Sequence, residues 1–124
     1  MARYDELDAY RCVYDTLLDT YRQIHNVPRE VRYTLLEALR NDLVDVLLHI
    51  TNANASADKS PSIKAARKIL TRVKLRTRLL KDLHCISDAQ YQHFSEKLVS
   101  SSKQLTGWQR YADKKNTVND RYES

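Results

Sequence analysis

Eight Lys and Arg side chains and no carboxylate fall within residues 64–81, KAARKILTRVKLRTRLLK. A row of cations on one helix supplies the sequence-independent attraction that displaces counterions from nucleic acid. Residues 59–81 hold nine basic groups, and since the whole chain carries +5, the remaining residues together carry −4. This segregation of charge predicts a phosphate-binding surface. The candidate nucleic-acid-binding residues are Lys64, Arg67, Lys68, Arg72, Lys74, Arg76, Arg78 and Lys81.

A second interpretation is that acidic side chains neutralise this basic segment, within one protomer or between protomers. Acidic positions in the first two helices are Asp15, Asp19, Asp42 and Asp45. Surface ion pairs of that kind contribute little each. A membrane surface fits less well, because the basic segment has no Trp or Phe to insert. Nucleic acid is therefore the favoured partner.

The sequence lacks the patterns expected of an enzyme or a metal site. It has no Gly-rich phosphate loop, no HExxH, no GxSxG and no paired carboxylates. The four His residues are dispersed, and Cys12 and Cys85 lie far apart, with no CxxC. We therefore expect no catalytic residue, no metal and no cofactor, and two reduced thiols.

Four helices are expected to position the basic side chains. The chain has one Gly and two Pro in 124 residues, which favours long helices over hairpins. Pro28 is expected to begin the second helix, while Ser60 and Pro61 are expected to form the N-cap and first turn of the third. Ser87 and Gln90 have the spacing of a capping box before the fourth helix.

Apolar residues recur in each helix at spacings of three and four, which predicts one buried stripe per helix. The fold class is therefore all-α: an antiparallel up-down-up-down four-helix bundle over residues 1–113, with a frayed polar tail over 114–124. The tyrosines of the first stripe are expected at the core or its edge. The predicted stripes are Leu7, Tyr10, Tyr14, Leu17, Tyr21 and Ile24; Leu36, Leu39, Leu43, Val46, Ile50 and Ala53; Ile63, Ala66, Ile69, Leu70, Val73, Thr77, Leu80 and His84; and Tyr91, Phe94, Leu98, Leu105, Trp108 and Ala112.

Two apolar pairs fall outside these stripes. Leu75 and Leu79 lie one helical turn apart and point nearly opposite the core, and Val44 and Leu48 repeat the pattern. Two such pairs indicate a second buried contact, and another copy of the chain is the simplest partner. We expect a homo-oligomer.

No apolar run approaches the length of a membrane span. The first residues, MARYDELDAY, lack the apolar core of a signal peptide. The expected location is the cytoplasm.

Three segments carry a resemblance to a known family. ITNAN at 50–54, RLLKDL at 78–83 and KQLTGW at 103–108 are its most specific pieces, and the similarity covers about residues 4–112. The chain resembles the accessory variability determinants of diversity-generating retroelements. These are small four-helix-bundle proteins, grouped with proteins encoded by intervening sequences of ribosomal RNA genes.

The resemblance implies a ring-like homo-oligomer, a pentamer, that binds nucleic acid with little sequence preference. It also implies a reverse transcriptase partner, which copies template RNA with errors at adenines and performs the chemistry. Arg78, Lys81, Gly107 and Trp108 match the family's segments. Because a residue without a Cβ permits close approach, Gly107 and Trp108 are expected to pack internally or at a subunit interface.

Two functional hypotheses follow. In the first, the chain is a non-catalytic accessory subunit that binds template RNA or cDNA through the basic helix. In the second, it is an oligomeric scaffold, related to the ribosomal intervening-sequence proteins, whose basic helix is used in subunit contacts.

Overall fold

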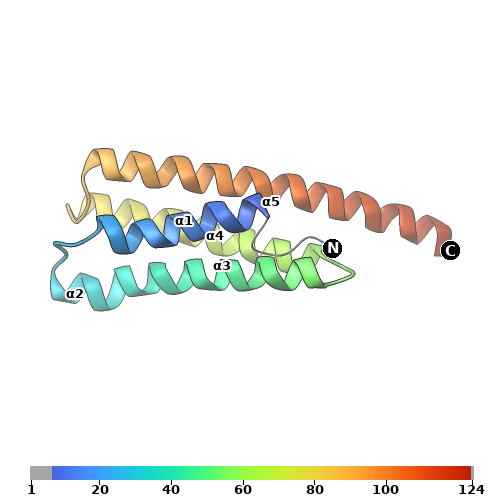
Figure 1. The fold of residues 1–124 in the computed structure, drawn as a ribbon, viewed down its shortest axis with the longest axis horizontal. Helices are drawn as coiled ribbons and strands as arrows, with labels where there is room; N and C mark the ends of the chain where they lie inside the picture. Colours follow the sequence, from blue (N-terminus) through green and yellow to red (C-terminus); the bar gives the residue numbers. More distant parts are fainter. Residues whose placement is uncertain (1–6, 124) are drawn as a thin grey trace.

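The computed structural model describes residues 7–123, the last six of them by backbone alone, and this part of the chain is helical without strands (Figure 1). The elements are α1 (Asp8–Gln23), α2 (Arg29–Val31), the π-helix η2 (Arg32–Leu36), α3 (Glu37–Ala55), α4 (Ser60–Asp82) and α5 (Asp88–Glu123). Because α2, η2 and α3 follow one another without a break, they form the expected second helix. The predicted all-α class and four-helix bundle are confirmed.

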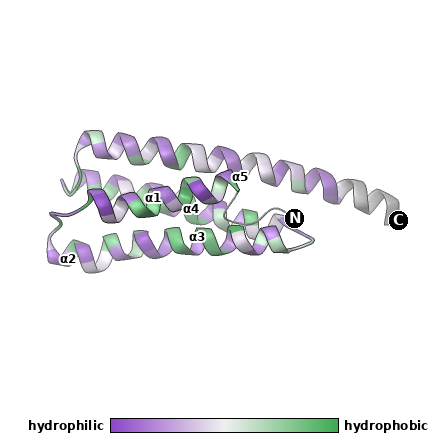
Figure 2. Cartoon of the chain, in the orientation of Figure 1, coloured by the Kyte–Doolittle hydropathy of each residue, from purple (hydrophilic) through white to green (hydrophobic). Residues whose placement is uncertain are grey.

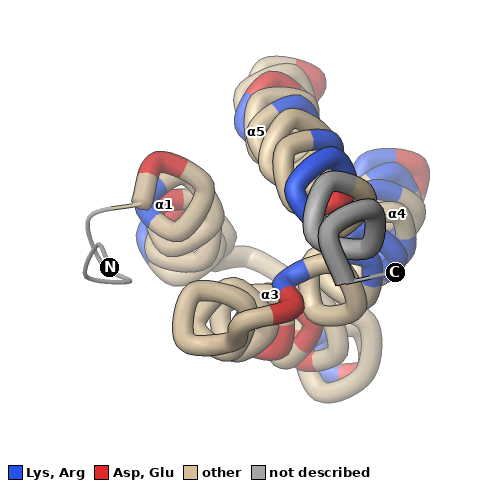
Figure 3. The backbone as a smooth tube through the Cα atoms, turned by 90° about the vertical axis from the view of Figure 1, so that its right-hand side faces the viewer, with Lys and Arg blue, Asp and Glu red and all other residues tan. Residues whose placement is uncertain are grey.

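Each long helix packs against two neighbours. α1 packs against α3 and α5, and α4 packs against the same two helices, so α1 and α4 lie at opposite corners of the bundle (Figure 3). Asn52 of α3 donates to Ser62 of α4 at 2.7 Å, whereas Asp42 pairs with Arg72 and Arg76. Residue numbers therefore fall along α3 as they rise along α4.

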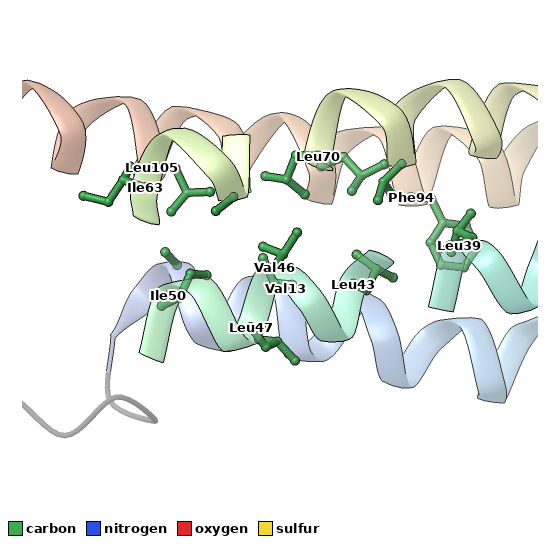
Figure 4. Close-up of a cluster of buried hydrophobic side chains, with 14 of the residues drawn as sticks. Val13, Leu39, Leu43, Val46, Leu47, Ile50, Ile63, Leu70, Phe94 and Leu105 are labelled. Carbon is green, nitrogen blue, oxygen red and sulfur yellow. The ribbon is translucent and has the colours of Figure 1, made fainter. Parts of the chain in front are cut away.

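The core follows the predicted stripes of the second, third and fourth helices closely. Leu43, Ile50, Leu70 and Leu105 are at most 1% exposed, and apolar side chains from α3, α4 and α5 meet in the interior (Figure 4). Hydrophobic and hydrophilic residues are interspersed along the helices, as expected when one face of each is buried (Figure 2). Each buried side chain of this size stabilises the fold by about 1.5–3 kcal/mol. No described helix is long and apolar enough to cross a membrane.

Of the three tyrosines in the predicted stripe of α1, Tyr10 is half-buried and packs against the core as expected, but the prediction is wrong for Tyr14 and Tyr21. Tyr14 and Tyr21 are 44% and 58% exposed, and the buried face instead carries Val13, Thr16 and Thr20. The threonine hydroxyls donate to carbonyls one turn earlier, Thr16 to Cys12 at 2.8 Å and Thr20 to Leu17 at 2.7 Å. Small side chains with satisfied hydroxyls therefore occupy the core in place of Tyr14 and Tyr21.

The periodicity also placed His84 wrongly in the core stripe of the third helix. Its side chain is exposed, and its φ is 60°. The amide of His84 donates to the carbonyl of Lys81, and the amide of Cys85 donates to that of Leu80, both at 2.9 Å. This is the Schellman pattern, in which a left-handed residue ends the helix. His84 therefore terminates α4 instead of extending its core face.

The helix boundaries agree with the sequence at most points. In the predicted capping box, Gln90 Oε1 accepts from the Ser87 amide at 2.8 Å, and Ser87 Oγ accepts from the Gln90 amide at 3.1 Å. Ser60, however, does not cap α4: its hydroxyl donates to Asp113 of α5 at 2.6 Å. The helix α5 extends through the expected tail to Glu123, and fraying of this end stays a prediction.

The π-helix is a feature that the periodicity did not predict. One extra residue in the turn rotates the preceding helix by about 100° relative to the following one. That rotation brings Val31 onto the same face as Leu39 and Leu43, where it packs against the core. The irregular turn therefore lets both parts of the second helix face the interior.

Candidate nucleic-acid interface

Two of the eight predicted binding residues, Arg72 and Arg76, are held by a carboxylate of the neighbouring helix. Arg72 Nη2 donates to Asp42 Oδ1 and Arg76 Nε to Asp42 Oδ2, both at 2.8 Å. Asp42 is 6% exposed, and its hydrogen bond raises the pKa of the Arg72 guanidinium. These cations therefore join α4 to α3, as the second interpretation of the basic segment expected for Asp42.

The basic side chains near the end of α4 also have partners. Arg78 Nε lies 3.1 Å from Asp82 Oδ2, one turn along the helix, and this hydrogen bond raises the pKa of Arg78. The ammonium of Lys81 lies 4.8 Å from the ring centroid of Tyr91 on α5. An exposed pair like Arg78 and Asp82 contributes little to stability, but the carboxylate offsets the positive charge of Arg78.

The other four predicted residues, Lys64, Arg67, Lys68 and Lys74, line a hollow between α4 and α5. Arg67 Nη1 donates to Gln109 Oε1 of α5 at 2.5 Å. Gln109 is neutral, so the guanidinium charge of Arg67 is not compensated by this bond. The remaining lining residues are the small polar side chains Thr71, Ser102 and Thr106.

A second hollow extends the first along α5 and shares Lys74, Ser102 and Thr106 with it. The two hollows together form the basic groove. Its additional lining residues are Val99, Lys103, Gly107 and Arg110, all from α5.

Sequence reasoning missed the contribution of α5 to this groove. Lys103 and Arg110 are seven residues apart, a spacing that places both on one face of a helix. That spacing was the only signal in the sequence that α5 adds cations to the groove. It is a weak signal unless the face of α5 that lies beside α4 is known. Figure 3 shows Lys and Arg on both α4 and α5, with Asp and Glu prominent on α3.

The charge of the basic groove has no acidic counterpart. Six cations line it and no carboxylate does. Among the described residues, five of the six make no hydrogen bond or ion pair; they are Lys64, Lys68, Lys74, Lys103 and Arg110. Six uncompensated cations around one groove create a field that attracts anions.

The residues predicted for the oligomer interface lie on different parts of the surface. Leu48 and Leu75 are both 62% exposed, Val44 is 41% exposed and Leu79 is 43% exposed. All four are therefore accessible in the protomer. Trp108 is half-buried and packs against the core, so it has an internal packing role.

No group of three His, Cys, Asp or Glu side chains among residues 7–117 lies close enough to hold a metal ion. Cys12 and Cys85 are free thiols, each half-buried.

No family model matches the chain, and no curated protein matches it.

Proposed function

We propose that this protein is a non-catalytic, nucleic-acid-binding accessory protein that contacts its ligand through the basic groove. The observation that carries this proposal is the set of six cations lining one groove without a carboxylate. Repulsion among these cations is not relieved within the described protomer. A phosphate backbone relieves it, and the counterions that the polynucleotide releases add a favourable entropy.

The resemblance to the accessory variability determinants supports a more specific role in the cytoplasm. In this role the protein holds template RNA or cDNA for a reverse transcriptase, which performs the mutagenic copying. The groove binds the nucleic acid without chemistry, and the polymerase supplies the active site. Association with that polymerase is part of the proposal.

A second candidate function is an oligomeric scaffold. The observation in its favour is the exposure of Val44, Leu48, Leu75 and Leu79 on the protomer surface. The proposed assembly is a ring of antiparallel up-down-up-down bundles, and the number of five subunits comes from the resemblance. Pairing of Arg72 and Arg76 with Asp42 inside one chain argues against a basic helix used only between subunits.

The first prediction concerns the groove lysines. Titration of labelled single-stranded RNA, followed by anisotropy at several salt concentrations, compares the wild-type protein with the triple variant Lys64→Gln, Lys68→Gln, Lys74→Gln. Each neutralised phosphate contributes about 0.7 to the slope of log affinity against log salt. We expect the triple variant to lose at least tenfold in affinity and about 2 in slope.

The matched control removes the same charge elsewhere, with Arg11→Gln, Arg22→Gln and Arg29→Gln on α1 and α2. All three arginines are exposed. The control is expected to bind within about threefold of wild type. Equal losses in the two triple variants would mean that net charge, and not the groove, attracts the RNA.

A further inference from the structure

Gly107 is the only glycine of the chain, and it lies inside the long helix α5. Glycine is less favourable than alanine at such a position, because it loses more backbone freedom on folding. It has no positive φ, and a Cβ at this position would meet no described atom within 4 Å other than those of its chain neighbours and the adjacent backbone of α5. The expected internal close approach is therefore absent, and nothing within the described protomer requires glycine at this position.

The position of Gly107 in the basic groove suggests an external reason. Lys103 precedes it by four residues and Arg110 follows it by three, so the two cations lie one turn to either side. Lys74 lines the same hollow from α4. A phosphate chain that contacts all three cations must pass over Gly107, where the backbone of α5 lacks a covering side chain.

The rest of the lining indicates which part of a nucleic acid is bound. No aromatic side chain among the described residues lines the groove, whose neutral members are mainly Ser, Thr and Gln. Proteins that bind unpaired bases commonly stack them on aromatic rings. Here the cations and hydroxyls are suited to phosphates and sugars instead.

We propose that the sugar–phosphate backbone of the bound nucleic acid makes its closest approach to the protein at Gly107, and that the groove binds the backbone without stacking the bases. This inference rests on the proposed nucleic-acid-binding function.

Side-chain size at position 107 tests the close approach without changing charge. Gly107→Ala should raise Tm by a few degrees through helix propensity, yet lower RNA affinity about threefold. Gly107→Leu should lower affinity at least tenfold, and neither variant should change the salt slope. The control is Ala89→Leu: Ala89 is exposed, and 18 residues place it five turns away on the same side of α5, outside the groove.

An abasic oligonucleotide of equal length tests whether the groove binds the sugar–phosphate backbone without the bases. It is expected to bind within about threefold of the oligonucleotide that carries bases. Wild-type affinity in Gly107→Leu, or a large loss with the abasic probe, would overturn the inference. A lower assembly mass of Gly107→Leu by light scattering would assign Gly107 to a contact between copies and would also overturn it. If the wild-type protein binds no RNA at low salt, the proposed function itself fails, which is a distinct result.

Discussion

Asp19 is a buried carboxylate through which α1 is joined to α5. His93 Nε2 lies 2.8 Å and Lys97 Nζ lies 2.5 Å from Asp19 Oδ2, and both donate to it. Burial alone would raise the pKa of the Asp19 carboxyl. The hydrogen bonds and positive charges of Lys97 and His93 outweigh burial, so the pKa lies below its ordinary value. The ionised carboxylate is thus the form that stabilises the fold.

We expect Asp19→Asn to lower the free energy of unfolding by about 1–2 kcal/mol at pH 7, because the amide keeps the shape but loses the charge-assisted bonds. The pKa of Asp19 is lower in the folded state than in the unfolded state. Its stabilisation is therefore present above the unfolded value of about 3.9 and is lost as the pH falls through the folded value. Urea unfolding at several pH values should show the two proteins converging in acid.

The control for this prediction is Asp15→Asn on the same helix. Asp15 is exposed, and a surface change of this kind is expected to alter stability by less than about 0.5 kcal/mol at any pH. A constant difference between wild type and Asp19→Asn from neutral to acid pH would contradict the assigned role of the carboxylate.

At the scale of the helices, α3 and α4 both end without the glycine that commonly follows the last turn of a helix. Lys59 and His84 take its place. Lys59 Nζ donates to the carbonyls of Ala53, Asn54 and Ser56 at 3.1, 3.2 and 2.8 Å. These carbonyls lie at the end of α3, where a cation also interacts favourably with the helix dipole. His84 closes α4 in the left-handed conformation.

The conformation of His84 leads to a prediction about stability. A side chain at φ of 60° is strained by its Cβ, whereas glycine adopts this region readily. His84→Gly is therefore expected to raise the free energy of unfolding by about 0.5–1 kcal/mol, measured by urea unfolding.

The same substitution in the middle of a helix should have the opposite effect. His49 lies within α3, and His49→Gly is expected to lower stability by about 1 kcal/mol. If both glycine variants are less stable than wild type, the left-handed residue does not limit the stability of α4.

At the scale of the whole molecule, the edge formed by α1 and α3 lies opposite the edge that carries the basic groove. The guanidinium of Arg40 lies 3.9 Å from the ring centroid of Tyr21, so this tyrosine faces α3. Val44 and Leu48 follow Arg40 at successive turns and continue the same face. Tyr21, Val44 and Leu48 therefore share one edge of the bundle, and the cations of the basic groove lie on the opposite edge.

This division predicts which apolar pair maintains the proposed assembly. Because Val44 and Leu48 lie on the same edge as the exposed Tyr21, Val44→Gln with Leu48→Gln should shift the mass in light scattering toward the 14.5 kDa protomer. Leu75→Gln with Leu79→Gln serves as the matched control and should reduce the mass less. Circular dichroism is expected to remain helical in both, since all four side chains are exposed.

A wild-type mass of 14.5 kDa at micromolar concentration would remove the case for any ring. A larger effect of the Leu75 and Leu79 substitutions would instead place the contact on α4, beside the cations. That second result would favour the scaffold over nucleic-acid binding.

The sequence by itself determined the features that are local along the chain. Apolar spacing predicted the buried faces of α3 and α4, and the capping box of Ser87 and Gln90 predicted the start of α5, because both depend on residues within a few turns of one another. The segregation of positive charge onto one helix was equally readable. These features required no knowledge of which helices are neighbours.

Only the tertiary structure decided how the cations are used. Arg72 and Arg76 meet Asp42 because α3 lies on one side of α4, and Lys64, Lys68 and Lys74 form a groove because α5 lies on the other. Packing against neighbouring helices likewise decided that Tyr14 and Tyr21 of α1 are exposed. A helical pattern leaves several faces nearly equal in hydrophobicity, and packing against particular neighbours selects the one that is buried.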